Sequence, residues 1–160
     1  MDFFYPNWIN DMWRIVGLLF FDDRHHFEIK TEKRFDKERI VEFCSIFGLA
    51  LFDAASAVRR LQDSASDKFL EVVTQTDIRG LLERCPTLRA IVTTGEKATD
   101  QVVEQFACEK PKVGACVEIQ HAGRTLHFWR MPSSSRAYPL SLEKKAEFYR
   151  ILFRACEILG

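Results

Sequence analysis

The middle of the chain alternates helical and strand-like patterns, and this alternation constrains the fold more than any other feature. Asp77 is placed to cap a helix that ends before Pro86. The apolar run at residues 88–93 predicts a buried strand, and Gly95 turns it directly into a predicted helix over residues 96–106. Helices that alternate with apolar strands are typical of a parallel sheet covered on both faces. We therefore expect an α/β fold, a three-layer α/β/α sandwich around a central, mostly parallel sheet.

The first part of the chain predicts a buried helix followed by an exposed connection. Residues 10–21 are mostly apolar but too short to span a bilayer, which suits a buried helix that starts from a cap at Asn10 or Asp11. Residues 22–38 are rich in charged side chains, and we expect them to run along the surface.

The next segment predicts an amphipathic helix and a second strand. A helix is predicted to begin after Asp36 and to stop at Gly48, because apolar residues recur at helical spacing between them. Its apolar stripe consists of Ile40, Phe43, Cys44 and Phe47. The apolar residues 49–52 predict a short buried strand that ends at Asp53, followed by a loop of Ala, Ser and Arg.

The last third predicts a hairpin, a Ser-rich loop and a final helix. Residues 115–119 and 125–129 are expected to pair as strands across a tight connection. The Ser-rich loop, residues 131–137, follows the second strand, and Ser141 is placed to cap the final helix. The apolar stripe expected on that helix consists of Phe148, Ile151, Leu152, Ala155, Ile158 and Leu159.

Length and composition favour one domain over residues 1–160, large enough to bury an apolar core without disulfides or metals. Five cysteines form no CxxC pair and are odd in number, so we expect reduced core thiols. His25 and His26 are neighbours with no further ligand at metal spacing, which favours a solvated loop over a metal site. A secretory signal and a membrane span are absent from the pattern, and we expect a cytoplasmic monomer.

Charge is balanced overall but not along the chain. The sequence has 23 Lys and Arg against 23 Asp and Glu, which argues against strong non-specific binding to DNA. The last forty residues, however, hold seven Lys and Arg against three Asp and Glu. This asymmetry is compatible with one basic face, although scattered cations on a solvated helix give the same count.

The Ser-rich loop and the helix after it carry a resemblance to a known family. The sequence RMPSSSRA at residues 130–137, followed by SLEKK at residues 141–145, resembles the PSxSPA loop and following helix of the uracil-DNA glycosylase superfamily. The resemblance is strongest to its mismatch-specific and hypoxanthine-type branches. Arg136 stands where the family usually has Pro, so this loop is expected to be less stiff.

Two further patches are similar to the same family, in the same order along the chain. The first, FYPNWINDMW at residues 4–13, resembles the aromatic and NxFW stretch that forms one wall of the base pocket. The middle patch combines GLALFD at residues 48–53, DSASD at residues 63–67 and TTGEKA at residues 93–98. It is similar to the family's strand ending in WD, its Ser-containing loop and its later strand-to-helix turn.

The resemblance implies a monofunctional DNA glycosylase of base excision repair. Such an enzyme hydrolyses the N-glycosidic bond of a flipped-out deaminated or mismatched base, such as uracil or hypoxanthine, in double- or single-stranded DNA, with water and without a cofactor or metal. Three tasks follow from the chemistry. An aromatic ring holds the base, polar groups recognise its edge and stabilise the leaving group, and one group orients the attacking water.

The resemblance assigns these tasks to particular residues. Base binding falls to Tyr5, Asn10 and Asp53. Binding of the DNA backbone falls to Pro132, Ser133, Ser134, Ser135, Arg130 and Arg136. Each assignment has a structural alternative: Tyr5 anchors the first helix, Asn10 caps it, Asp53 merely begins a loop, and the Ser residues form a turn before a capped helix.

The residue that positions the water has no counterpart in the sequence. In the family, a first strand and a Gly-containing loop with a catalytic Asn or Asp precede the aromatic patch, whereas this sequence starts at Met1. We expect the sheet to lack that first strand, the water-positioning residue to lie upstream of Met1 in a longer reading frame, and the 160-residue form to be inactive. The alternative is a short form that has lost catalysis and acts as a non-catalytic nucleic-acid-binding or partner-binding module. An unrelated α/β enzyme acting on a small nucleotide is a third possibility.

Overall fold

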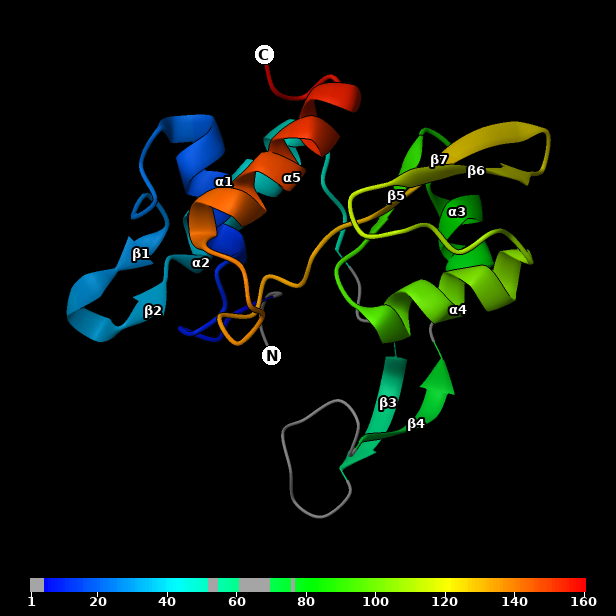
Figure 1. Cartoon of the computed structure of the whole chain (residues 1–160), viewed down its shortest axis with the longest axis horizontal. Coiled ribbons are helices and arrows are strands. Elements are labelled where there is room, and N and C mark those ends of the chain that lie inside the picture. Colours follow the sequence, from blue (N-terminus) through cyan, green and yellow to red (C-terminus); the bar gives the residue numbers. More distant parts are fainter. Residues whose placement is uncertain (1–4, 52–54, 61–69, 76) are drawn as a thin grey trace.

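The structure is a computed structural model that describes residues 5–51, 55–60, 70–75 and 77–160, without the side chains of residues 55–60 and 70–75. The fold is mixed α/β. Its elements form a helical group, which contains the first and last helices, and a sheet group, which contains a three-stranded sheet (Figure 1). Each group encloses its own apolar cluster. None of the described helices has the length and apolar character that a membrane-spanning helix requires.

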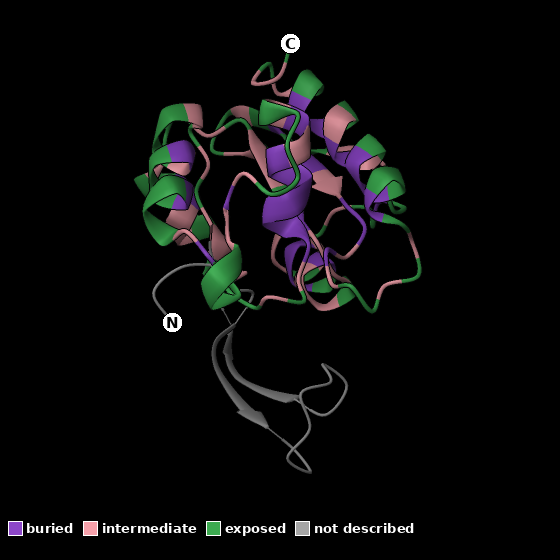
Figure 2. Ribbon diagram, turned by 90° about the vertical axis from the view of Figure 1, so that its left-hand side faces the viewer, coloured by how far each residue is buried: buried purple, intermediate pink, exposed green. Residues whose placement is uncertain are grey.

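The helical group is built from α1 (Met12–Phe21), α2 (Lys37–Phe47) and α5 (Leu142–Ala155). Helix α1 packs against α5 and is buried along most of its length, as predicted (Figure 2). Helix α2 is also confirmed. The Asp36 side chain accepts from the Arg39 N–H at its start, and Gly48 ends it with a positive φ of 73°.

The connection between α1 and α2 runs mainly along the surface, as predicted, but two of its phenylalanines enter the core. It forms β1 (Glu28–Ile29), the 3-10 helix η1 (Lys30–Glu32) and β2 (Arg34–Phe35), with the two strands antiparallel. Phe27 and Phe35 are each only 1% exposed. The charged residues of this segment dominate its composition, and they concealed two rings that pack inward.

The sheet group contains β5 (Ala90–Thr93), β6 (Cys116–His121) and β7 (Arg124–Arg130) in the order β5-β7-β6. Strand β7 pairs in parallel with β5 and antiparallel with β6. The predicted hairpin is confirmed, and its two-residue turn has positive φ at both Ala122 (51°) and Gly123 (78°). This combination is characteristic of the type I′ turn that matches strand twist.

Helices α3 (Ile78–Arg84) and α4 (Glu96–Phe106) pack on one face of the sheet. Both are confirmed predictions, and the Asp77 side chain caps α3 by accepting from the Gly80 N–H. Strand β5 was expected to be buried, but within the described residues it pairs only with β7 and so forms an edge. Val92 in this strand is accordingly 41% exposed.

The segment between α2 and α3 differs from prediction. Residues 49–51 are not in a strand, and the expected loop after them contains β3 (Ala55–Arg60), which pairs antiparallel with β4 (Leu70–Gln75). This hairpin lies apart from both groups in Figure 1. A strand requires a neighbour for its backbone hydrogen bonds, and no described strand pairs with residues 49–51.

Helix α5 begins as predicted, because the Ser141 side chain accepts from the Lys144 N–H, but its buried face differs from the expected stripe. Ile151 is 58% exposed. The buried residues of α5 are Leu142, Lys145, Ala146, Tyr149, Leu152 and Phe153. Leu152 belongs to both sets, and Phe148, Ile158 and Leu159 are partly buried against the cluster of the helical group, as expected. The prediction was wrong for Ile151 and Ala155, which are exposed, and it omitted Lys145 and Tyr149.

Candidate functional site

The N-terminal segment and the Ser-rich loop lie near opposite ends of the chain and pair with each other. Asn10 and Ser135 form an antiparallel β-bridge. The Asp11 N–H donates to the Ser134 carbonyl oxygen at 2.8 Å. Figure 1 shows the two segments side by side below α1 and α5. The first and last patches of the family resemblance are thus in direct contact.

The Asp11 carboxylate joins this contact. It is buried, and its Oδ1 accepts from Arg14 Nη1 at 3.0 Å and from Arg136 Nη2 at 3.3 Å. The Arg136 N–H also donates to the Ile9 carbonyl oxygen at 3.1 Å. One carboxylate therefore links α1 to the Ser-rich loop through two arginines.

Asn10 caps α1, which is the structural role that the sequence left open. Its Oδ1 accepts from the Met12 N–H at 3.0 Å, while the N-cap residue Asp11 makes no side-chain capping bond. A side-chain oxygen at this place satisfies one of the unpaired N–H groups of the first turn. Contact of Asn10 with a base stays a prediction.

Tyr5 connects the N-terminal segment to the sheet group. Its hydroxyl is 2.8 Å from Thr94 Oγ1, at the turn between β5 and α4. The backbone of Tyr5 has a φ of 56°, a left-handed conformation that is uncommon for a bulky residue and is often held in place for function. Tyr5 and Thr94 bring the first patch into contact with the later part of the middle patch.

The three serines of the Ser-rich loop have different environments. Ser133 Oγ accepts from the Ser135 N–H at 3.2 Å, and Ser135 Oγ accepts from the Ala137 N–H at 3.3 Å. Ser134 is buried, as is Pro132. Ser133 and Ser135 are partly exposed, so they are the hydroxyls that a phosphate reaches without movement of the loop.

Two side chains of α5 hold the loop from beneath. Lys145 Nζ donates to the Ser135 carbonyl oxygen at 2.7 Å, and the Tyr149 hydroxyl donates to the Pro132 carbonyl oxygen at 2.9 Å. Both side chains lie on the buried face of α5. The loop is therefore fixed by hydrogen bonds to the carbonyl groups of Pro132, just before the serines, and of Ser135, the last of them.

Burial shifts the pKa values of both supporting groups. Desolvation lowers the pKa of the Lys145 ammonium and Arg136 lowers it further, while Asp11 acts in the opposite direction. Desolvation, with a smaller contribution from Tyr5, raises the pKa of the Tyr149 phenol well above its ordinary value. Tyr149 is thus a neutral hydrogen-bond donor throughout the physiological pH range.

Arg130 and Arg136, predicted to act together on the DNA backbone, contact different parts of the molecule. Arg130 Nη1 donates to the Pro111 carbonyl oxygen at 3.2 Å. Arg136 instead contacts Asp11 and has a side chain that is 52% exposed. Arg136 is the better placed of the two to meet a ligand at the Ser-rich loop.

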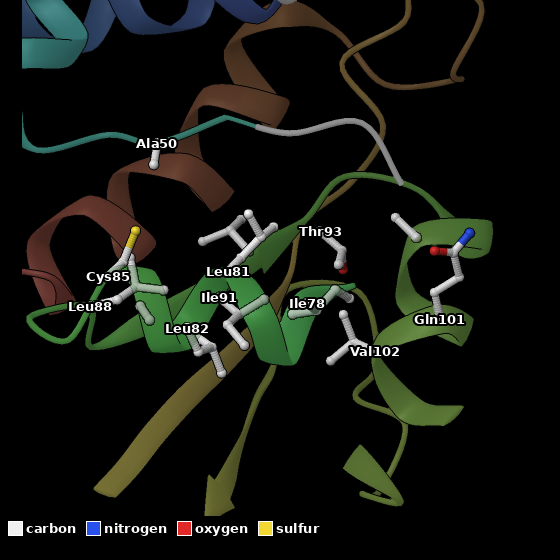
Figure 3. A pocket seen from close by; sticks show the side chains of 13 residues that line it. Ala50, Ile78, Leu81, Leu82, Cys85, Leu88, Ile91, Thr93, Gln101 and Val102 are labelled. Carbon is white, nitrogen blue, oxygen red and sulfur yellow. The ribbon is translucent and has the colours of Figure 1, made fainter. Parts of the chain in front are cut away.

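Asp53, predicted to bind the base, lies outside the described residues, as do residues 61–69 with the expected Ser-containing loop. Ala50 faces β5 across an apolar cavity of about 170 Å³ (Figure 3). All of β5 lines this cavity on one side, with α3 and α4 around it and Ala50 opposite. The middle patch thus borders a hollow at the open edge of the sheet.

The cavity has one polar side chain with unused hydrogen-bonding capacity. Gln101 lines it and is 6% exposed, and no described group donates to its buried Oε1. Thr93, at the same end, already bonds Thr99 Oγ1 at 2.8 Å. A buried acceptor without a partner costs free energy, which favours occupation of this space by a donor.

Sequence reasoning missed Asp11 as a linking residue and Lys145 as a support. Asp11 was considered only as a helix cap, and Lys145 was overlooked although it lies four residues after the Ser141 cap and three after Leu142, on the buried face. A lysine at such a position is the usable signal, since buried lysines are rare unless paired.

The side chains that could bind a metal, and the cysteines, form no cluster of metal ligands and no disulfide among the described residues. In the part of the chain that the structure describes, no cluster of three His, Cys, Asp or Glu side chains is arranged to hold a metal ion. The five cysteines are free and partly buried.

Comparison of the chain with protein-family models, with curated proteins and with solved structures finds no match.

Proposed function

We propose that this protein is a monofunctional DNA glycosylase that hydrolyses the N-glycosidic bond of a flipped-out deaminated or mismatched base. The observation that supports it is a convergence. Asn10 pairs with Ser135, and the Tyr5 hydroxyl bonds Thr94, so three separated patches of the family resemblance meet. A pocket for an extruded nucleotide requires groups from separate segments around one point.

In this proposal, some site residues contact the extruded base and others contact the DNA backbone. The Tyr5 ring stacks on the extruded base, while its hydroxyl is fixed by Thr94. Ser133 and Ser135 hydroxyls contact the flanking phosphates, and Arg136 adds positive charge beside them. These contacts orient the sugar without recognising sequence. No described residue is assigned the task of positioning the water.

The fold proposed for the active protein is the three-layer α/β/α sandwich. Helices α3 and α4 cover one face of the sheet, while Trp129, on the opposite side of β7 from Phe128, packs against the cluster of the helical group. We propose that a further strand pairs with the open edge of β5. The apolar cavity along that edge supports this assignment, as does Gln101 Oε1, which accepts no hydrogen bond from any described group.

A non-catalytic nucleic-acid-binding module on the same fold is the second candidate. It is favoured because the polar groups at the contact between the patches already bond to other groups of the protein. Asn10 caps α1, the Asp11 carboxylate contacts two arginines, and the Tyr5 hydroxyl bonds Thr94. Asn10 Oδ1 and Asp11 Oδ1 thus already serve contacts within the protein.

Release of free base is the decisive measurement. Duplex and single-stranded DNA with one uracil or one hypoxanthine would be incubated with the protein, undamaged duplex would serve as the blank, and released base would be quantified by chromatography. Release without added metal supports the glycosylase. Because the 160-residue form is expected to be inactive, the assay is repeated with the product of the longer reading frame. Binding without release by that product as well selects the non-catalytic module, and the absence of both binding and release overturns both candidates.

Two variants of Tyr5 test the site itself. We expect Tyr5→Phe to keep most activity because the ring remains. Tyr5→Ala should lower the rate of release by about 5- to 150-fold, which corresponds to a base-stacking contribution of about 1–3 kcal/mol. Equal rates for the two variants would contradict the assignment of Tyr5 to base stacking.

A further inference from the structure

We propose that a basic hollow beside the Ser-rich loop is a second phosphate site, which takes a nucleic-acid backbone phosphate outside the Ser133 and Ser135 contacts. The inference rests on the proposed function in that both need a nucleic-acid ligand. The hollow has a volume of about 410 Å³. Four cationic side chains, Arg14, Arg24, Lys30 and Arg136, line it with a single carboxylate, Glu28.

Arg14 forms a rigid base for this site. Its side chain is 6% exposed, and its Cζ lies 4.6 Å from the centroid of the Trp8 ring and 5.0 Å from that of Phe35. Aromatic rings that stack on a guanidinium restrict its rotamers. Because a guanidinium is only weakly hydrated, this stacking removes little favourable hydration. The guanidinium is therefore oriented before any ligand arrives.

The hydrogen bonds of Arg14 leave one edge of the guanidinium available. Nε donates to Glu28 Oε1 at 2.6 Å, and Nη1 is surrounded by Asp11 Oδ1 at 3.0 Å and the Trp8 carbonyl oxygen at 2.8 Å. Among the described residues, Nη2 has no acceptor within hydrogen-bonding distance. A guanidinium carries five donors suited to phosphate oxygens, and two of them are unused here.

The local carboxylates do not cancel the positive charge. Glu28 is inward-facing, with Oε1 bonded to Arg14 and Oε2 accepting from His25 Nδ1–H at 2.7 Å. Asp11, behind the hollow, serves Arg14 and Arg136 together. Lys30 is exposed and makes no ion pair within the described residues, so it supplies charge in excess.

A nucleic-acid backbone fits this surface better than an isolated phosphate compound. Arg136 lines the hollow and directly follows Ser135, so the hollow adjoins the Ser-rich loop. Successive phosphates along one strand can meet both. Arg24 extends the basic rim, and its contact with Glu143 at 3.4 Å is solvent-exposed and weak.

The salt dependence of duplex binding tests the site. The variant is made at Lys30, which is exposed, so its substitution does not disturb the fold. Binding of undamaged duplex would be measured between 50 and 200 mM salt for wild type, Lys30→Ala and Arg84→Ala. Arg84 is exposed on α3 in the sheet group and gives the same charge change. We expect Lys30→Ala to make the negative slope of log K against log salt shallower by about 0.9, with five- to tenfold weaker binding, and Arg84→Ala to match wild type.

A second measurement follows Arg14 directly. Inorganic phosphate and the undamaged duplex would each be titrated while the Arg14 Nε–Hε resonance is recorded, and we expect both to shift it in wild type and less in Lys30→Ala. Equal salt slopes for the two variants overturn the site, and a shift with phosphate but not with duplex overturns its assignment to nucleic acid. Since neither experiment uses a damaged base, the site can stand or fall separately from base release.

Discussion

The helical group encloses fifteen buried apolar residues among those described, whereas the cluster of the sheet group has five. In the helical group, Phe43 stands among rings whose centroids lie 4.9 Å (Phe20), 5.6 Å (Phe27) and 4.6 Å (Phe47) away. Such offset and edge-to-face ring contacts add to the stabilisation that burial provides. The helical group therefore contributes most of the tertiary stability.

The sheet group is less completely packed. It has an edge strand, a cavity of about 170 Å³ and, among the described residues, the two buried side-chain atoms without a partner, Gln101 Oε1 and His121 Nε2. Unfilled apolar space and unsatisfied polar atoms both raise the free energy of a fold. The helical group therefore holds the candidate site in place, while the sheet group has room for an additional element.

The largest effect is expected from removing the central ring of the helical group. Phe43→Ala deletes a ring that is 3% exposed and should lower the free energy of unfolding by about 3–5 kcal/mol. Urea unfolding followed by circular dichroism measures it. Val41→Ala, at a residue 52% exposed on the same helix, is the control. Similar losses for both would refute the central role of the ring cluster.

A substitution that adds volume tests how tightly the helical group is packed. Ala146 is 1% exposed in α5, so Ala146→Leu has no space to occupy and should lower the free energy of unfolding by about 1–3 kcal/mol. Chemical denaturation gives the value. Unchanged or higher stability would mean that this group also contains unfilled space.

The hydrogen bond beneath the Ser-rich loop gives the next effect. Tyr149→Phe leaves the Pro132 carbonyl oxygen without its donor and should cost about 1–2 kcal/mol at pH 7.

Tyr149 also predicts a pH dependence of stability. Because folding raises the pKa of Tyr149, the unfolded chain loses this proton first, and the stabilising contribution falls as pH rises from the ordinary phenol pKa of about 10 towards the raised folded value. The free energy of unfolding, measured between pH 8 and 11, should therefore decline more steeply in wild type than in Tyr149→Phe. Parallel curves would contradict the assignment.

The smallest effect has the opposite sign and concerns the sheet group. Ala98 lines the cavity from α4, so Ala98→Leu should fill part of it and raise the free energy of unfolding by about 0.5–1 kcal/mol. Thermal and urea unfolding of Ala98→Leu and of Ala146→Leu would compare the same Ala-to-Leu substitution in the two groups. Destabilisation by both variants would remove the distinction between them.

Local sequence signals predicted most of the helices and the hairpin. Asp36, Asp77 and Ser141 cap the helices that they were expected to cap, and the Ala122-Gly123 turn joins the expected strands. These features depend on residues close together in the sequence, and so they can be predicted without the fold.

Features that depend on distant partners were predicted less well. Residues 49–51 have the composition of a strand but no described strand beside them. The predicted face of α5 was only partly right, because Lys145 and Tyr149 are buried through hydrogen bonds to the Ser-rich loop, which no local pattern indicates. Of the candidate site, the sequence indicated the three patches, whereas the Asn10–Ser135 and Tyr5–Thr94 contacts were seen only in the structure and the roles on DNA stay predictions.

The strand order has a consequence for how the sheet forms. Strands β6 and β7 are joined by a two-residue turn, so they can pair as a local unit early in folding. Strand β5 can join β7 only after α4 and the hairpin have closed a long loop, which is entropically costly. Pulsed hydrogen exchange should protect the amides of Ile119 and Leu126 before that of Ile91, and the reverse order would show that the crossover forms first.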